Sequence, residues 1–346
     1  MNGTILKMLT APILVNTIDY HTGGEPFRIV TEGYGTLAGT TVGERRVSAQ
    51  NSEAVDRIRQ MLVQEPRGHT DMYGCFITEP DDAGADFGAV FWHKDGYSTA
   101  CGHGTMALGV WAVEERIVES DPDGITVVTI DVPSGRVAAH VESAGGVVQR
   151  VTFENVPSYV TGQNIKVDVD GREYTVDLSY GGAIYACLDV AQLGLDIAKE
   201  NYSELRAIGR AVKWACNELP EAQHSDSRLS GVYGTILFQK LEDLPAGPRQ
   251  INMTVFADGE VDRSPCGSGT SARLACLAAS GEITTNTLTH DSIVGSTFLG
   301  TVRPFEPSVT EFPSVIPVVT GMAYRTGRHE FELNPADDLG TGFILF

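Results

Sequence analysis

The chain has 346 residues and a formal net charge of −20, from 25 basic and 45 acidic side chains. This charge repels the phosphates of nucleic acids and of anionic membranes, so we expect neither nucleic-acid binding nor attachment to a membrane surface. The length predicts about two domains, each large enough for its own core.

Strand-like stretches dominate the chain. The expected strands are 13–20, 27–33, 86–96, 124–135, 136–143, 150–157, 165–182, 232–239 and 251–259. The expected helices are 54–64, 106–116, 191–199, 202–219 and 271–281. Few of these segments alternate as strand–helix–strand units, so the sequence predicts a mixed α/β fold with much antiparallel pairing.

Proline, glycine and asparagine interrupt the pattern at 155–164. We therefore expect an N-terminal lobe, 1–157, and a C-terminal lobe, 158–346, whose last strand could return to the first lobe. The apolar patch near the start, 8–15, has Lys7 beside it and no cationic segment before it. We expect no signal peptide, no membrane-spanning segment and a cytoplasmic location.

The pattern Cys-Gly-x-Gly-Thr occurs twice, as CGHGT at 101–105 and as CGSGT at 266–270. Each copy opens an apolar helical run, and the residues before it are also alike, VFWHKDG at 90–96 and VFADG at 255–259. At a helix N-terminus, free N–H groups and the macrodipole stabilise a thiolate or a ligand carboxylate. The repetition predicts two half-sites that face each other across a small anionic substrate, whereas one such cysteine alone would be read as a packing residue.

The remaining cysteines form no CxxC motif and no short-chain disulfide framework, which fits a reducing compartment. We expect them to pack in the interior: Cys75, Cys187, Cys216 and Cys276. Cys101 and His103 are both metal-ligand types, but no second close pair supports them. The sequence therefore predicts no metal site.

Six segments resemble the proline racemase family, and together they span nearly the whole chain. They are DYHTGGEPFRIV at 19–30, QEPRGHTDMYG at 64–74, DGYSTACGHGTMALG at 95–109, VDLSYGGAIYA at 176–186, YGTILF at 233–238 and VDRSPCGSGTSARLA at 261–275. Within the family, the chain is most similar to the trans-3-hydroxy-L-proline dehydratases. The resemblance implies a fold like that of diaminopimelate epimerase, with strands around a central helix in each of two similar lobes, an active site in the cleft, and no cofactor.

Cys266 departs from the dehydratase pattern, which typically has Thr there, whereas racemases and 4-hydroxyproline epimerases have Cys at both positions. Ala100 stands where Met is usual. The resemblance implies that Cys101 and Cys266 are catalytic. It assigns the substrate carboxylate to the backbone N–H groups of Gly102, His103, Gly267 and Ser268.

Asp262 corresponds to a family carboxylate near the substrate ring nitrogen; a turn or N-cap aspartate is the structural alternative. The His103 side chain could orient Asp262. His224 stands where relatives often have a His-Pro pair, so substrate binding is one interpretation and a surface histidine is the other. Three motif residues have no assigned role and are expected to make buried hydrogen bonds: His21, Glu25 and His69.

The expected chemistry is removal of the α-proton from a proline-type imino acid. One thiolate and one thiol on opposite faces of the α-carbon can exchange roles between enantiomers. Elimination needs only one cysteine, because the hydroxyl and the α-hydrogen of trans-3-hydroxy-L-proline lie on the same face. Cys266 then adds reprotonation from the opposite face.

The sequence therefore predicts a trans-3-hydroxy-L-proline dehydratase that forms pyrroline-2-carboxylate and has 2-epimerase capacity. One alternative is a proline racemase or 4-hydroxyproline 2-epimerase without dehydratase activity. Another is a non-catalytic amino-acid-binding or redox-sensing protein. The sequence decides neither the preferred ring hydroxyl nor the oligomeric state, although a homodimer is compatible with it.

Overall fold

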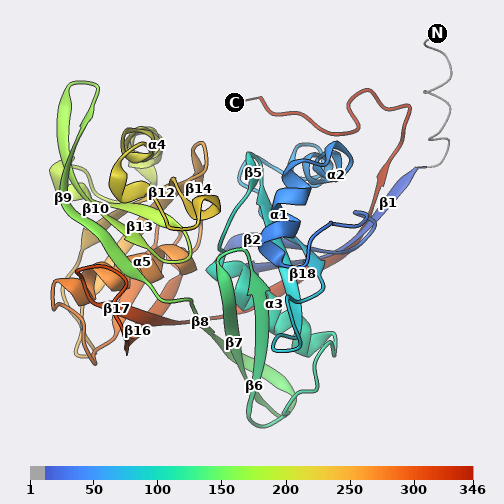
Figure 1. Cartoon of the computed structure of the whole chain (residues 1–346), viewed down its shortest axis with the longest axis horizontal. Helices are drawn as coiled ribbons and strands as arrows, with labels where there is room; N and C mark the ends of the chain where they lie inside the picture. The colour runs from blue at the N-terminus through green and yellow to red at the C-terminus, as the bar shows by residue number, and fades with distance from the viewer. Residues whose placement is uncertain (1–11, 346) are drawn as a thin grey trace.

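In the computed structural model, which describes residues 12–345, strands form two groups, each around one buried helix (Figure 1). The first group consists of β1 (Ile13–Thr22), β2 (Glu25–Glu32), β3 (Gly74–Thr78), β4 (Phe87–His93), β5 (Gly96–Tyr97), β6 (Ile125–Val132), β7 (Gly135–Ala144), β8 (Val147–Glu154) and β18 (Ala323–Leu333). The second group consists of β9 (Tyr159–Val169), β10 (Arg172–Tyr180), β11 (Ile184–Asp189), β12 (Val232–Lys240), β13 (Arg249–Phe256), β14 (Glu260–Val261), β15 (Leu288–Ser292), β16 (Thr297–Phe305) and β17 (Ser314–Gly321).

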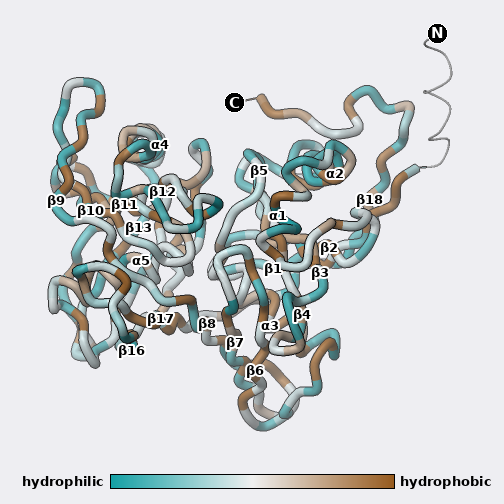
Figure 2. Tube along the Cα trace, viewed as in Figure 1, coloured by the Kyte–Doolittle hydropathy of each residue, from teal (hydrophilic) through white to brown (hydrophobic). Residues whose placement is uncertain are grey.

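The two central helices are α3 (Gly102–Glu114) and α5 (Gly267–Ala279). Nearly all their residues are buried, as expected for helices that are apolar or small on every side. The outer helices are α1 (Val42–Gln50), α2 (Glu53–Val63) and α4 (Tyr202–Cys216). In Figure 2, hydrophilic and hydrophobic stretches alternate along the surrounding strands, as in sheets with one buried face.

Both groups contain the same structural unit around their cysteine. In the first group β4 and β5 form a hairpin, α3 follows, and β6 then pairs parallel with β4. In the second group β13 and β14 form the hairpin, α5 follows, and β15 pairs parallel with β13. The repeated cysteine motifs therefore occupy equivalent positions in two similar units.

The groups are connected by strand pairing at their lower edge, where β17 pairs antiparallel with β8. The chain returns to its start, because β18 pairs antiparallel with β1 over most of its length. Most other pairings are antiparallel, and the predicted mixed α/β class is confirmed. No helix within residues 12–345 has the length and apolar character needed to cross a bilayer.

Three expectations about individual elements were wrong. The helix expected at 191–199 is absent; two short 3-10 turns, Val190–Gln192 and Lys199–Asn201, flank Gly194, whose φ of +69° does not fit a right-handed helix. Helix α1 was not expected, although Thr41 and Glu44 form a capping box at its start. Seven strands were not among the expected ones: β3, β11, β14, β15, β16, β17 and β18. The segment 1–11, where no signal peptide was expected, lies outside the described residues.

Candidate active site

The two repeated cysteines cap the two central helices. Cys101 is the N-cap of α3, and its Sγ accepts a hydrogen bond from Gly104 N at 3.2 Å. Cys266 is the N-cap of α5, and its Sγ accepts one from Gly269 N at 3.3 Å. Cys266 also has a φ of +62°, a left-handed conformation that is unfavourable for a residue with a Cβ. Strain at this cap agrees with a functional constraint on the position of the thiol.

The N-termini of α3 and α5 meet end to end. A Cβ atom added to Gly102 would lie 2.6 Å from the Cα of Gly267, and the reverse substitution would give the same distance. Only glycine permits this approach of two backbones. Within residues 12–345, no acceptor is found for four amides at this junction: Gly102, His103, Gly267 and Ser268. Two helix N-termini with free N–H groups therefore converge on one point, an arrangement suited to a carboxylate.

A small cavity of about 10 Å³ lies between the two thiols. Its lining residues are Tyr73, Ala100, Cys101, His103, Tyr185, Tyr233, Phe256, Asp262, Cys266 and Ser268. A volume of this size accommodates about one water molecule. The cavity therefore has to widen before a proline-sized ring can enter.

Burial raises the pKa of both thiols well above the usual value for cysteine. This direction is opposite to the stabilisation of a thiolate that free N–H groups at a helix N-terminus provide. Each sulfur accepts only one backbone N–H, and this single contact does not offset the loss of water. Asp262 adds negative charge near both sulfurs and acts in the same direction.

The environment of Cys101 includes a neutral imidazole. His103 Nδ1 lies 3.5 Å from Cys101 Sγ, and burial lowers the pKa of His103 to about 3. The same ring nitrogen lies 3.8 Å from an Asp262 oxygen. His103 thus connects the thiol and the carboxylate, while it remains uncharged at neutral pH.

Asp262 lies in a buried pair of carboxyl groups. Its Oδ1 accepts hydrogen bonds from the backbone and side chain of Ser264 at 2.8 and 2.7 Å. Burial raises the pKa of Asp262 to about 6, and burial together with the charge of Asp262 raises the pKa of Glu25 well above its usual value. Glu25 accepts a hydrogen bond from Arg263 N at 2.7 Å. Of the two, Asp262 is the carboxyl group that ionises near neutral pH.

The environment of Cys266 consists of hydroxyl groups. The Tyr185 hydroxyl lies 3.8 Å from Cys266 Sγ and 2.7 Å from Ser268 Oγ. Ser268 occupies the position after Cys266 that His103 occupies after Cys101. The two thiols therefore have equivalent backbone positions but different chemical neighbours.

Comparison with known proteins places this geometry in one family. The family model described as "Proline racemase" matches residues 17–344. The chain belongs to the proline racemase family. It is 40% identical over 334 residues to a trans-3-hydroxy-L-proline dehydratase from Bacillus cereus, covering 96% of this chain and 98% of that protein. A 3-hydroxyproline 2-epimerase from Burkholderia multivorans is 41% identical over 337 residues, with 96% and 98% of the two chains covered.

A solved structure of the family has the same fold. The crystal structure of a hydroxyproline epimerase from Agrobacterium vitis, with bound trans-4-OH-L-proline, matches with a TM-score of 0.86 at 29% identity, covering 96% of both chains. The predicted membership of the proline racemase family is confirmed, and the relatives named here are enzymes. The individual site residues stay predictions, which the geometry above describes for this chain.

This member of the proline racemase family has three cavity tyrosines that the sequence did not single out. Tyr73, Tyr185 and Tyr233 each stand inside a motif that carries the family resemblance, and that is the only sequence signal for them. They come from separate parts of the chain and meet through side-chain contacts. The Tyr73 and Tyr233 hydroxyls are 3.1 Å apart, and the Tyr185 and Tyr233 rings meet edge-on at 5.8 Å.

The structure does not bring His224 into the cavity. Its ring lies 5.0 Å from that of Tyr180, and its Nδ1 accepts a hydrogen bond from Asp226 N at 2.9 Å. Of the motif residues without a role, His21 accepts a hydrogen bond from Gly24 N, and His69 accepts one from Asp71 N. The other four cysteines are buried, as expected: Cys75, Cys187, Cys216 and Cys276.

One cluster in the described part of the chain has the composition of a metal site. Ligand atoms of His93, Asp95 and Glu260 lie within 4.8 Å of one another. The Lys94 ammonium lies 2.7 Å from Asp95 and 3.9 Å from Glu260. This cation supplies the positive charge that the carboxylates require, so the cluster forms an ion-pair network between β4 and β14.

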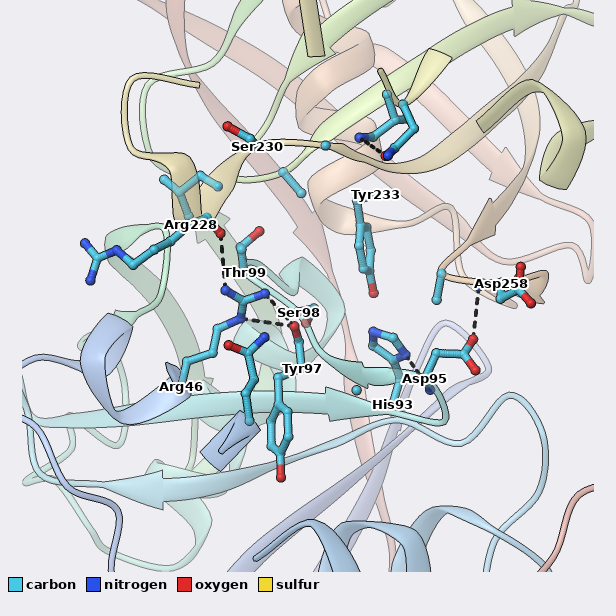
Figure 3. A pocket seen from close by; sticks show the side chains of 18 of the residues that line it. Arg46, His93, Asp95, Tyr97, Ser98, Thr99, Arg228, Ser230, Tyr233 and Asp258 are labelled. Carbon is cyan, nitrogen blue, oxygen red and sulfur yellow. Dashed lines mark hydrogen bonds between the residues drawn. The ribbon is translucent and has the colours of Figure 1, made fainter. Parts of the chain in front are cut away.

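A larger cleft of about 550 Å³ adjoins the cavity and is lined by both strand groups (Figure 3). Tyr233 lines the cleft as well as the cavity. Its hydroxyl points toward His93 in Figure 3. Arg46 crosses the cleft and donates a hydrogen bond to the Arg228 carbonyl at 3.2 Å. Tyr233 therefore forms part of the wall between the large cleft and the space between the thiols.

Proposed function

We propose that the chain removes the α-proton of hydroxyproline without a cofactor, as a trans-3-hydroxy-L-proline dehydratase with 2-epimerase capacity. The observation that carries the proposal is the end-to-end meeting of two cysteine-capped helices at one cavity. The dehydratase and epimerase relatives at 40% and 41% identity support both activities. The substrate class is then a proline-type imino acid.

In the proposed mechanism, the four free amides at the junction of α3 and α5 hold the substrate carboxylate. Asp262 accepts a hydrogen bond from the protonated ring nitrogen. This nitrogen brings a positive charge into the cavity and lowers the pKa of the neighbouring thiols, which burial alone raises. The substrate thus contributes the charge that makes a thiolate available.

In the proposed elimination, the Cys101 thiolate takes the α-hydrogen as a proton, and the electron pair of that C–H bond forms the C2=C3 double bond. The C3–O bond breaks, and the leaving oxygen takes the proton from the Cys101 thiol and departs as water. Cys101 is again a thiolate, and the product is pyrroline-2-carboxylate. Epimerisation follows instead when the Cys266 thiol protonates the α-carbon from the opposite face.

A second function, racemisation or 2-epimerisation without elimination, is favoured by one residue. Cys266 stands where the dehydratase pattern has Thr, and a thiol on each face is the requirement for a racemase. The two functions differ in the fate of the 3-hydroxyl group, so product analysis separates them.

The test is incubation with trans-3-hydroxy-L-proline in D₂O, with pyrroline-2-carboxylate and the D-configured epimer measured together. We expect both products, and Cys101→Ser should lower both by about 100-fold or more because a serine hydroxyl is a poor proton acceptor. Cys266→Thr should suppress the epimer and spare much of the elimination. Equal loss of both products in Cys266→Thr would contradict elimination on one face.

Two other outcomes would redirect the proposal. Racemisation of proline or 4-hydroxyproline without any elimination would establish the second function. The absence both of pyrroline-2-carboxylate and of deuterium at the α-carbon of every proline isomer would favour a binding or redox-sensing protein.

A further inference from the structure

Three hydroxyl groups, those of the buried Tyr73 and Ser98 and of the half-buried Tyr233, form a chain beside the cavity. The Tyr73 hydroxyl contacts Ser98 Oγ on one side and lies 3.1 Å from the Tyr233 hydroxyl on the other. Tyr73 and Ser98 belong to the first strand group, and Tyr233 belongs to the second. Tyr73 and Ser98 are 2% exposed, and Tyr73 and Tyr233 both line the cavity.

The three hydroxyl groups have one more O–H donor than their two mutual contacts use. Three hydroxyl groups carry three O–H protons, and the two contacts consume two of them. Within residues 12–345, these hydroxyls make no further hydrogen bond. Whichever hydroxyl donates in each of the two contacts, one O–H remains for another acceptor. Ser98 and Tyr233, the two ends of the hydroxyl chain, also line the large cleft, so the spare O–H can donate to water there or to a ligand in the cavity.

The substrate offers few groups that could be this acceptor. In the proposed mechanism its carboxylate is bound by the N–H groups of the helix N-termini, and its protonated ring nitrogen is a hydrogen-bond donor. The ring hydroxyl oxygen is the remaining acceptor. Burial raises the pKa of Tyr73 and Tyr233 well above the usual value, so both phenols stay protonated and donate a hydrogen bond without giving up the proton.

The position of these hydroxyl groups can be compared with the face of the substrate ring that carries the 3-hydroxyl group. The Tyr73 ring lies 5.1 Å from the His103 ring, and His103 is the neighbour of the Cys101 thiol. Tyr185 instead lies beside Cys266. Tyr73 is therefore on the Cys101 side, where the 3-hydroxyl of trans-3-hydroxy-L-proline lies when Cys101 takes the α-proton. Tyr233 lies between Tyr73 and Tyr185 and contacts both.

We propose that Tyr73 and Tyr233 form the subsite for the ring hydroxyl of the substrate and so determine specificity for hydroxylated over unsubstituted proline rings. This inference rests on the proposed function and adds the residues that recognise the hydroxyl group. The hydrogen bond also stabilises the oxygen as the C3–O bond breaks. Because Tyr233 comes from the second strand group, the subsite is complete only when the two groups are together.

The test compares a ligand with a ring hydroxyl and a ligand without one. For Tyr233→Phe and Tyr73→Phe, we expect kcat/KM for trans-3-hydroxy-L-proline to fall about five- to tenfold, the effect of one lost neutral hydrogen bond. The inhibition constant of pyrrole-2-carboxylate, which has no hydroxyl, should stay within about twofold. Tyr174→Phe is the matched control, a buried tyrosine outside the cavity lining, and should change neither quantity.

Equal losses for the two ligands, or no loss with hydroxyproline, would overturn the subsite while leaving the proposed function intact. Tyrosine-to-phenylalanine changes keep the ring, and pyrrole-2-carboxylate binding reports directly that the cavity is still formed. If the protein without substitutions neither eliminates water from the substrate, nor exchanges the α-hydrogen, nor binds pyrrole-2-carboxylate, the proposed function is wrong, and the subsite with it.

Discussion

The two candidate catalytic cysteines have one backbone geometry and two chemical environments. A neutral imidazole, His103, lies next to Cys101, whereas the hydroxyls of Tyr185 and Ser268 surround Cys266. A neutral imidazole nitrogen can accept a hydrogen bond from a thiol, and a hydroxyl can donate one to a sulfur. The two faces of a bound ring would therefore meet different acid–base partners, which suits an enzyme that eliminates from one face and reprotonates from the other.

Asp262 gives the first prediction. Because burial raises its pKa to about 6, it loses its charge as the pH falls through that value, and its attraction for a cationic ring nitrogen is lost with it. We expect kcat/KM of the unchanged chain to decline below about pH 6. Asp262→Asn should lower kcat/KM at pH 8 by about 10- to 100-fold, the effect of a lost hydrogen bond to a charged group.

The pH profile of the variant decides this assignment. The residual activity of Asp262→Asn should lack the acid limb, whereas the exposed control Asp170→Asn should retain it. An acid limb of the same position in Asp262→Asn would assign the titration to another group, of which the neighbouring Glu25, whose pKa is also raised by burial, is the candidate.

At the residue scale, the sequence predicts the part of the site that lies in continuous motifs. Cys101, His103, Asp262 and Cys266 fall within two short segments, and the structure brings all four to one cavity. The tyrosines were not predictable in the same way. They come from separate segments, and no local pattern specifies where the side chain of a single tyrosine points. The raised pKa of the thiols also depends on burial that only the packed structure defines.

At the scale of elements, the meeting of α3 and α5 depends on glycine at both ends. In Gly267→Ala, the new Cβ would lie 2.6 Å from Gly102 Cα, so the two helices have to move apart. We expect kcat/KM to fall by about tenfold or more, because a misplacement of about 1 Å at a catalytic site has large effects. The midpoint of thermal unfolding should fall as well, because the atoms that the new Cβ meets are all backbone atoms at a buried junction.

A matched substitution tests this explanation. Gly43→Ala also adds a Cβ to a helical glycine, but its nearest contact is the flexible end of Arg228 at 3.2 Å. It should leave kcat/KM within about twofold. If Gly267→Ala retained full activity, the close approach of the two helices would not be required for carboxylate binding.

The elements differ in how well the sequence predicts them. The central helices follow from their continuous apolar runs and the amphipathic α2 and α4 from their periodicity, and all four are present. The segment 191–199 has the composition of a helix, but its glycine adopts a positive φ and divides it into two short turns. Helix α1 is only nine residues long and has few apolar positions, so its capping box was the only strong signal.

At the scale of the whole molecule, contacts between the two strand groups hold the cavity closed. Asp71 of the first group accepts a hydrogen bond from Val261 N at 3.0 Å and pairs with Arg263 of the second group at 2.7 Å. Asp95 accepts a hydrogen bond from Asp258 N at 3.0 Å. We propose 1–157 and 158–346 as the two lobes that these contacts join, with β18 returning to the first lobe through its pairing with β1. The sequence could not predict these contacts, because their partners are more than 160 residues apart.

The Asp71–Arg263 ion pair gives the last prediction, since it connects the lobes without lining the cavity. Asp71→Asn keeps an oxygen that can accept the Val261 N–H but removes the ion pair. A partly exposed ion pair is worth roughly 1 kcal/mol, so the closed arrangement should become about fivefold less populated relative to the open one. Because the bound complex is the closed arrangement, weaker closure destabilises it relative to the open free chain, and we expect KM and the pyrrole-2-carboxylate inhibition constant to rise by up to that factor while kcat changes less.

Salt and a matched variant separate this effect from a local one. Raising the ionic strength should increase KM of the unchanged chain more than that of Asp71→Asn, because salt screens the pair that the variant has already lost. Asp82→Asn removes an exposed ion pair with Arg136 that lies within the first strand group, at 2.7 Å, and should leave KM unaltered. A fall in kcat at constant KM would place Asp71 in the chemical step and not in closure. Weakened closure is expected to raise KM and to leave the rate of the bound complex largely unchanged.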